Sequence, residues 1–429
     1  MIVDDMAWSL LRKNALYTNS IIFVVGSVVA GFAGYLYQLF MGRLLSLEDF
    51  GTLATLTNFF SVMFVPATAL ITVTTQVVAG LKGQGRWGAI HDFVKRLVRF
   101  FAVVGFLLFG IFILIDPLVE RWLNIESHGA FLLFSASALF IFVVALFRGI
   151  LPALGRFQAL SIGYIIEGFL KCSVAVALVS LSFGLEGAVL GPVFASGIIF
   201  GIVYWQIRDV FKHPRDSFTV DHIPSLFAII FVWSLAITAL SSIDVILVKR
   251  FLSAEETGLY AGMSMLGKII LSISGSVAGV MFPMATELFE SGNHAEHRRL
   301  LIKALSAVVV IAGGGLLLYA FFPNLIVATL FGRKFLPASH LLIYFGTIAT
   351  LIGVIQIFAT YFLSLKKKWF ILLLIIASVL EAVLITLFHS SMRMILLEII
   401  SVFGVLVASL ISLFVFDAKP VDAPYVSRV

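Results

Sequence analysis

The sequence predicts an all-α, polytopic membrane protein with twelve transmembrane helices in two parallel six-helix repeats. Three observations lead to this prediction. Hydrophobic residues make up 61% of the 429 residues and charged residues only 12%, about half the charged fraction of a soluble protein. Apolar runs of about 20 residues, enough to cross a bilayer, recur along the whole chain. A short motif also occurs twice, at 43–54 and 250–261.

The apolar runs place the predicted helices in order. They fall near residues 16–42, 50–80, 98–115, 129–150, 157–180, 185–206, 224–248, 257–285, 301–322, 341–364, 369–389 and 394–416. The first run is longer than a signal-peptide core and no clear cleavage pattern follows it, so we predict a retained helix. Lys and Arg are far more numerous in the loops on the side of both termini. We therefore expect both termini in the cytoplasm and the protein in the cell membrane, and this bias accounts for the net charge of +6 without a nucleic-acid partner.

The repeated motif divides the chain into two modules. Each copy is a short polar turn between two apolar runs, and six positions are identical at an offset of 207 (250 − 43). These are Arg43/Arg250, Leu45/Leu252, Ser46/Ser253, Glu48/Glu255, Gly51/Gly258 and Ala54/Ala261. We predict an amino-terminal lobe at 1–207, a cytoplasmic linker at 208–223, a carboxyl-terminal lobe at 224–416 and a cytoplasmic tail at 417–429.

Local sequence adds two details to the predicted helices. Residues 87–101 and 293–303 are basic and amphipathic, which predicts helices that lie on the cytoplasmic membrane surface. Their cations either meet anionic headgroups or act only as topology determinants. Pro66, Pro192 and Pro283 fall inside apolar runs and should bend those helices.

Ionisable side chains at mid-bilayer are functional candidates, because each costs about 2.5–3.5 kcal/mol to insert. Lys268 lies near the middle of the run 257–285 and has no acid three or four positions away. It is our first candidate for binding an anionic ligand, and a structural ion pair is the alternative. Glu381 lies at a similar depth in a later run. It is a partner for Lys268, a proton-coupling carboxylate or a neutral hydrogen-bonded acid, and the sequence does not choose among these.

Other charged residues have local interpretations. Glu167 and Lys171 are four apart, with the acid first, so we favour an ion pair on one helix over ligand binding. Arg148 lies at the predicted cytoplasmic mouth of its helix, where snorkelling explains it. Asp244 precedes Lys249 by about one and a half turns, which predicts a local pair that anchors the turn.

A modest polar lining in the first two helices completes the predicted site. The candidate substrate-binding residues are Lys268, Lys171, Arg148, Gln76, Asn58 and Tyr35, and the candidate coupling or ion-pair carboxylates are Glu167, Glu381 and Asp244. The sequence has one cysteine, Cys172, no Cys/His metal spacing, no glycine-rich phosphate loop and no large outer loop. It therefore predicts no enzyme, no metal site and no cofactor.

Several motifs resemble those of the polysaccharide-biosynthesis flippases. The run 243–261 is similar to their signature at helices 7 and 8, and so are its first-half counterpart at 43–54 and the run 330–335. Phe282 and Pro283, followed by the basic segment 293–303, fit the same pattern. These flippases export oligosaccharide units and belong to the multidrug/oligosaccharidyl-lipid/polysaccharide (MOP) exporter superfamily. The similarity spans about residues 10–416.

The resemblance implies two MATE-like lobes that open alternately inward and outward around a cavity. It implies an undecaprenyl-pyrophosphate-linked oligosaccharide as substrate, with membrane lipids and a polysaccharide polymerase or other glycan-assembly proteins as partners. Buried cations such as Lys268 and Lys171 fit a diphosphate headgroup. The alternative is a cation-coupled multidrug or metabolite antiporter of the same superfamily. An antiporter needs a carboxylate in the first-lobe cavity, and the first two predicted helices have no acid in their cores.

Overall fold

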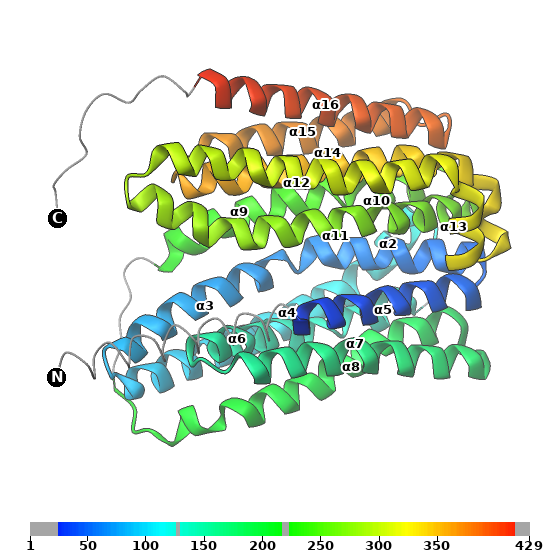
Figure 1. Ribbon diagram of the computed structural model, residues 1–429. Helices are drawn as coiled ribbons and strands as arrows, with labels where there is room; N and C mark the ends of the chain where they lie inside the picture. The colour runs from blue at the N-terminus through cyan, green and yellow to red at the C-terminus, as the bar shows by residue number, and fades with distance from the viewer. Residues whose placement is uncertain (1–24, 126–128, 217–222, 417–429) are drawn as a thin grey trace. The chain divides into compact units, whose positions relative to one another are not determined.

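The computed structural model describes residues 25–125, 129–216 and 223–416, and within these ranges every regular element is a helix (Figure 1). The protein is thus all-α, as predicted. In the described residues, each predicted apolar run coincides with a helix or a pair of helices. The chain forms two compact units. Unit 1 contains the described residues up to Gly262 and Val327–Pro337, and unit 2 contains Met263–Ile326 and the described residues from Ala338 onward.

Unit 1 begins with an unlabelled helix, Val25–Leu44. The helices that follow are α2 (Leu47–Met63), α3 (Val65–Gly83), α4 (Trp87–Leu123), α5 (Ala130–Ser135), α6 (Ala138–Ala153), α7 (Phe157–Leu178), η1 (Val179–Phe183), α8 (Gly184–Ile207), η2 (Arg208–Lys212), α9 (Ile223–Leu240) and α10 (Ile243–Phe251). The helix α11 (Ala254–Glu290) starts in unit 1 and continues into unit 2.

Unit 2 continues with the helices α12 (His294–Phe321), α13 (Pro323–Leu330), η3 (Arg333–Leu341), α14 (Leu342–Ser364), α15 (Trp369–Leu387) and α16 (Met392–Phe416). Helix α14 packs against both α12 and α16, and α15 packs against α16. The unit boundary at Met263 lies inside α11, whereas the sequence places its linker at 208–223. The predicted lobe and linker boundaries stay a prediction, as does the cytoplasmic tail at 417–429, which lies outside the described residues.

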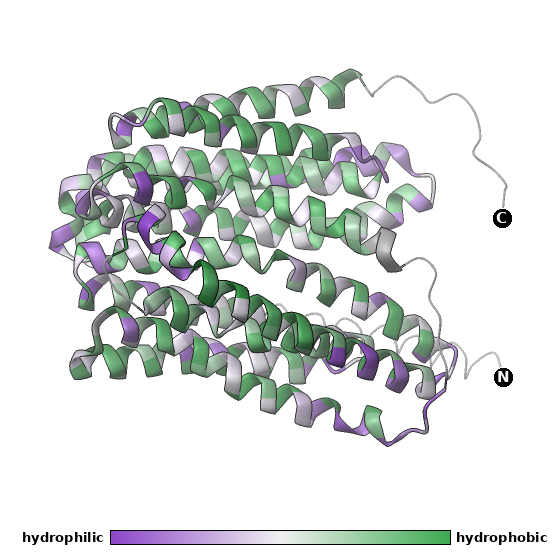
Figure 2. Cartoon of the chain, turned by 180° about the vertical axis from the view of Figure 1, so that it is seen from behind, coloured by the Kyte–Doolittle hydropathy of each residue, from purple (hydrophilic) through white to green (hydrophobic). Residues whose placement is uncertain are grey.

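The helices have the length and composition of membrane spans. In the part of the chain that the structure describes, 10 helices are long and apolar enough to cross a membrane. The number is 11 if the bent pair Phe227–Leu240 and Ile243–Phe251 is one span. This count takes Phe157–Lys212 as one segment, although it contains both α7 and α8. Figure 2 shows hydrophobic residues along the middle of the helices and hydrophilic residues gathered near their ends. The protein is therefore a multi-pass membrane protein, and the count of twelve helices in two repeats stays a prediction.

The two predicted surface helices are not separate elements. Residues 87–101 form the start of α4, a continuous helix of 37 residues, and residues 294–303 form the start of α12. Ile90 and Val94 are fully buried in the core of unit 1 rather than facing lipid headgroups. The apolar stripe was identified correctly, but its partner is protein.

A tight reversal between α7 and α8 brings the two helices side by side (Figure 1). Ser182 and Gly184 take left-handed backbone conformations there, with φ of 69° and 54°. At Gly191 a Cβ atom would lie 2.6 Å from the carbonyl oxygen of Lys171, so glycine permits the close approach of the backbones. Pro66 was predicted to bend its helix. The helical run is interrupted at Phe64, two residues before this proline, where α2 ends and α3 begins.

Both copies of the repeated motif start a helix in the same way. Ser46 caps α2 by accepting a hydrogen bond from the backbone N–H of Asp49, 3.0 Å away. Ser253 accepts from the N–H of Glu256 at 3.3 Å, and the Glu256 carboxylate accepts from the N–H of Ser253 at 3.1 Å. This reciprocal arrangement is a capping box. The shared serine therefore fixes where each helix begins.

The two copies also contact each other within unit 1. A Cβ atom on Gly51 would lie 2.8 Å from the backbone nitrogen of Gly258, and one on Gly258 would lie 2.0 Å from the carbonyl oxygen of Leu47. The equivalent glycines of the repeat thus form one close backbone crossing.

Segment 327–337 packs against the first motif copy. Phe331 and Phe335 lie edge-to-face on Phe50, each with ring centroids 5.6 Å apart. Arg43 donates to the carbonyl of Leu330 at 3.0 Å, and Lys334 donates to the carbonyl of Arg43 at 3.3 Å. These reciprocal bonds hold the two connecting loops together.

The glycine crossing gives a first prediction. Replacing Gly258 by alanine should lower the thermal stability by about 1–3 kcal/mol, because the new methyl overlaps the backbone at Leu47. Gly279→Ala on the same helix is the matched control, since nothing lies within 4 Å of its Cβ position. Its stability should be unchanged or slightly higher. Thermal melting followed by fluorescence-detected size exclusion measures both variants, and equal melting temperatures would contradict the close crossing.

Candidate functional site

Unit 1 contains a partly open cavity of about 330 Å³. Its wall is formed by the first helix, the α2–α3 junction and helices α5 to α8. Phe64, Phe134, Ile141 and Pro192 supply apolar surface, and the remaining lining is polar or small. The polar residues are Ser137, Tyr164, Glu167, Lys171 and Ser196. A mixed lining of this kind is usual for a small-molecule or headgroup site.

Helix α7 provides the charged face of the cavity. Tyr164, Glu167 and Lys171 are spaced by three and four residues, so they lie on one side of the helix. The lining also contains Gly168 from the same face. Of the predicted candidates, Glu167 and Lys171 are therefore brought together in one cavity.

The partner of Glu167 differs from the prediction. Its carboxylate pairs with Arg148 of α6, at 2.5 Å between Oε2 and Nη2, and not with Lys171 one turn along α7. The Arg148 guanidinium also lies 4.5 Å from the centroid of the Tyr164 ring. Arg148 is 9% exposed, so the predicted snorkelling is wrong. The reason is that antiparallel α6 brings the guanidinium to the acid, where a pair forms with better geometry than on one helix.

Lys171 makes a different contact. Its Nζ lies 4.8 Å from the centre of the Tyr37 ring on the first helix. Tyr37 is buried and donates its hydroxyl to the carbonyl of Ala188 on α8, at 3.0 Å. The ring is thus held in place, and a cation–π contact fixes the ammonium without neutralising it.

At formal charges, this group of side chains is positive. Glu167 and Lys171 line the cavity and Arg148 pairs with Glu167 from α6, so the three side chains together have one positive charge in excess. The acid is already occupied by the guanidinium. An anion that enters the cavity therefore finds an ammonium and several hydroxyl donors.

Lys268 and Glu381 belong to unit 2. Lys268 is half-buried on α11, and its carbonyl accepts the hydroxyl of Ser272 at 2.9 Å. Glu381 is 1% exposed on α15. Their roles, including the suggested pairing, stay predictions.

The remaining candidates fall outside the lining of this cavity. Asp244 accepts the hydroxyl of buried Tyr260 at 2.9 Å, a contact that links the start of α10 to α11. Its predicted pairing with Lys249 stays a prediction. Asn58 donates to the carbonyl of Ala54 on its own helix at 2.8 Å. Gln76 is exposed and Tyr35 half-buried.

Sequence reasoning missed three polar lining residues and underrated a fourth contact. Ser137, Tyr164 and Ser196 were not candidates, and Tyr37 was treated only as general polar lining. The spacing of Tyr164 before Glu167 and Lys171 was the available signal. No comparable signal marks the two serines, because they reach the cavity through packing of α6 and α8. In the described ranges, no cluster of three His, Cys, Asp or Glu residues has metal-site geometry.

The buried pair gives a second prediction. Arg148→Gln and Glu167→Gln should each lower stability by roughly 1–3 kcal/mol, because each leaves a buried charged partner. The double variant should lose less than the sum, with a coupling of about 0.5–3 kcal/mol. Thermal melting of the four proteins measures this cycle. The control is the exposed Glu290–Lys366 pair at 3.5 Å, where coupling should be near zero, and equal coupling in both cycles would count against a structural role for Arg148.

Known structures share this fold. An inward-facing multidrug resistance MATE family transporter of the MOP superfamily matches with a TM-score of 0.72 and 14% identity, covering 92% of this chain and 97% of that chain. The lipid II flippase MurJ in an inward closed conformation matches with a TM-score of 0.71 and 17% identity, covering 94% and 88%. A MOP superfamily transporter from Pyrococcus furiosus gives 0.66 and 15%, covering 94% and 95%.

These structural matches establish the fold. The family follows from a match to the sequence itself. No curated protein sequence matches the chain. The family model described as "Polysaccharide biosynthesis protein" matches residues 40–340, which is well over half of the 429 residues. The chain therefore belongs to the polysaccharide biosynthesis protein family.

Proposed function

We propose that this protein is a flippase that moves an undecaprenyl-pyrophosphate-linked oligosaccharide across the cell membrane by alternating access. Its family supports a role in surface polysaccharide assembly. One protein of the same fold is a lipid II flippase, which by its name moves a lipid. In this proposal both termini are cytoplasmic, and a polymerase or another glycan-assembly protein receives the product.

The observation that carries the proposal is the sign of the cavity in unit 1. Glu167 is neutralised by Arg148, and Lys171 supplies the excess positive charge. A diphosphate is the anionic part of a lipid-linked oligosaccharide, and an ammonium is a common protein ligand for phosphate. Tyr164, Ser137 and Ser196 offer hydroxyl groups for phosphate or sugar oxygens.

A cation-coupled drug antiporter is the rival function, since several MATE transporters share the fold. It would use a carboxylate in this cavity. Glu167 is such a carboxylate, but its charge is already occupied by Arg148 at 2.5 Å. For the Pyrococcus furiosus transporter, reverse polarity of the binding pocket suggests a different function. By the same reasoning, a positive cavity favours an anionic substrate over a cationic drug.

The other candidate residues also enter as proposals. Lys268, on α11 in unit 2, is a candidate for binding an anionic ligand. Glu381 and Asp244 are candidate coupling carboxylates, and Gln76, Asn58 and Tyr35 remain candidates for contacts in other conformations.

Removing the ammonium in unit 1 tests the proposal. Lys171→Gln should slow flipping of a fluorescent undecaprenyl-pyrophosphate oligosaccharide in proteoliposomes by about tenfold or more, because a charged hydrogen bond is worth about 1.5–3 kcal/mol. Accessibility of the fluorophore to a membrane-impermeant quencher measures the rate. Lys303→Gln, on the exposed side of α12, is the matched control and should be unchanged. A wild-type rate for Lys171→Gln would remove the cavity from the mechanism.

Lys268 gives a separate prediction. Lys268→Ala should abolish complementation of a strain that lacks the gene while the protein still inserts, and lipid-linked oligosaccharide should accumulate on the cytoplasmic side. Lys303→Ala should complement fully. An unchanged lipid pool together with altered drug sensitivity in the deletion strain would favour the antiporter.

A further inference from the structure

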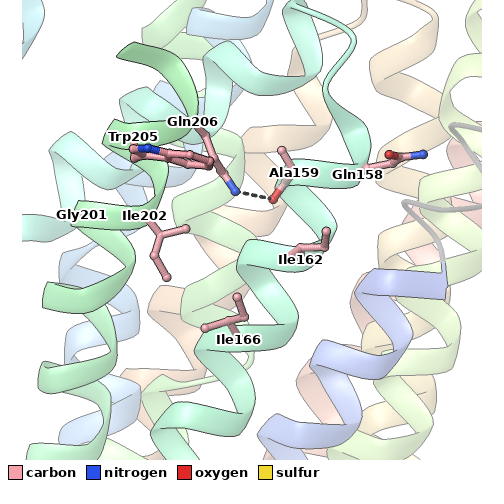
Figure 3. A pocket seen from close by; sticks show the side chains of 8 residues that line it. All are labelled: Gln158, Ala159, Ile162, Ile166, Gly201, Ile202, Trp205 and Gln206. Carbon is pink, nitrogen blue, oxygen red and sulfur yellow. Dashed lines mark hydrogen bonds between the residues drawn. The ribbon is translucent and has the colours of Figure 1, made fainter.

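A second hollow of unit 1 lies between α7 and α8, away from the cavity (Figure 3). It is an open groove of about 710 Å³. Ile162, Ile166 and Ile202 supply its apolar walls, and Trp205, Gln158 and Gln206 stand at one end.

The packing of α8 explains why space remains here. Near its start, α8 approaches α7 so closely that a Cβ on Gly191 would meet the backbone of Lys171. Farther along, Gly197 and Gly201 have no heavy atom within 4 Å of their Cβ positions. Gly201 lines the groove, so the missing side chain leaves the groove open.

The groove is separate from the substrate cavity. At about 100° per residue, Ile162 and Ile166 lie on the opposite side of α7 from Tyr164, Glu167 and Lys171. The first two line the groove and the last three line the cavity. A lipid whose headgroup occupies the cavity would have to pass around α7 to place its tail in the groove. The groove therefore suits a different lipid.

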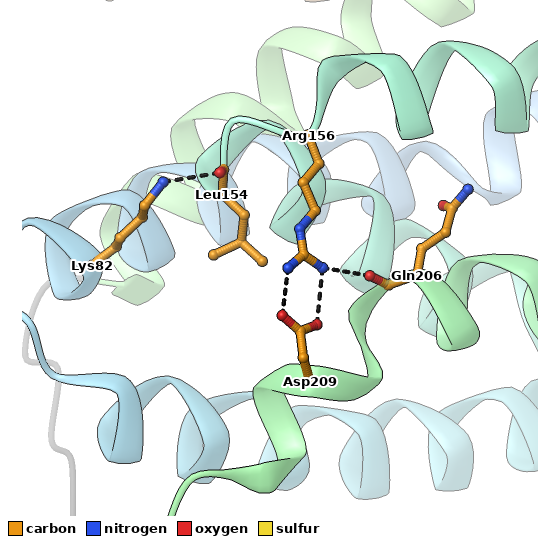
Figure 4. A network of polar contacts seen from close by, with 5 residues as sticks. All are labelled: Lys82, Leu154, Arg156, Gln206 and Asp209. Carbon is orange, nitrogen blue, oxygen red and sulfur yellow. Dashed lines mark hydrogen bonds and ion pairs between the residues drawn. The ribbon is translucent and has the colours of Figure 1, made fainter.

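An ion pair and two hydrogen bonds to the backbone hold the polar end of the groove together. Arg156 pairs through both amino groups with Asp209 and also donates to the carbonyl of Gln206 (Figure 4). The Gln206 amide donates to the carbonyl of Ala159 at 3.3 Å (Figure 3). These bonds tie the end of α8 to the start of α7, and they leave Arg156 and Asp209 neutral as a pair.

Arg208 is a further positively charged residue at the polar end of the groove, next to the lining residue Trp205. Its guanidinium carbon lies 5.1 Å from the Trp205 ring, and it forms no ion pair in the part of the chain that the structure describes. Trp205 is 62% exposed. An exposed tryptophan and arginine at the end of an apolar helix are typical of the headgroup level of a membrane.

We propose that this groove binds one anionic phospholipid of the leaflet that faces the α7 amino terminus, which is the cytoplasmic leaflet in the orientation proposed above. One acyl chain lies against Ile162, Ile166 and Ile202. The phosphate lies at Arg208, beside the Trp205 ring. The excess positive charge at an apolar groove is what selects an anionic lipid over a zwitterionic one.

Native mass spectrometry of the full-length protein in detergent tests this assignment. Dioleoyl phosphatidylglycerol and dioleoyl phosphatidylcholine are titrated separately. The wild type should bind the first lipid about tenfold more tightly at its strongest site. Gly201→Leu fills the groove and should remove this preference. Gly197→Leu, one turn earlier with the same open Cβ position, is outside the lining and should bind like the wild type.

A second pair of variants tests the charge. Arg208→Gln should weaken phosphatidylglycerol binding about tenfold and leave phosphatidylcholine binding unchanged. Lys212→Gln removes the same charge four residues later and should have little effect.

Equal affinity of the wild type for both lipids, or equal losses of phosphatidylglycerol binding in the two charge variants, would overturn the proposal. A competition experiment would show whether the lipid binds in the cavity instead. In that case undecaprenyl phosphate would displace phosphatidylglycerol from the wild type but not from Lys171→Gln. If Gly201→Leu does not purify as a single species, the charge pair decides alone.

Discussion

The ion pair between Arg148 and Glu167 determines what the cavity in unit 1 can accept. A carboxylate inside a membrane protein is costly unless a cation or hydrogen-bond donors meet it. Arg148 meets it from α6, so the acid is stabilised and α6 is joined to α7. Lys171 is then held by the face of Tyr37 rather than by an acid. If the lysine had taken Glu167, the arginine would have been the excess cation, in a different place.

The helical framework was predictable because a bilayer imposes length and composition on each span. Apolar runs gave the positions of the helices, and the repeated motif gave the two polar turns that precede α2 and α11. The partners of charged side chains were not predictable in the same way. The spacing of Glu167 and Lys171 on one helix suggested a local pair, whereas the actual partner lies 19 residues earlier. Such a contact depends on how α6 and α7 pack, and spacing along the chain contains no measure of that.

The starts of α4 and α12 illustrate a second limit. An amphipathic stripe such as Ile90 and Val94 shows that one helix face avoids water, but a membrane surface and a protein core satisfy it equally well. In the structure the core of unit 1 covers it. Similarly, Lys268 could be named as a candidate because a charged side chain is costly in lipid. The serines of the cavity cost little to bury, so no such signal marked them.

The crossing of Gly51 and Gly258 has an evolutionary consequence. After a gene duplication, each copy is ordinarily free to diverge, since a change in one half is not felt in the other. In the duplication that the repeated motif predicts, the descendants of one ancestral position touch each other. A larger residue in either half would push the same two backbones apart, so both halves are held to glycine by a single steric constraint. The duplicated turn is thus preserved by its own sister copy.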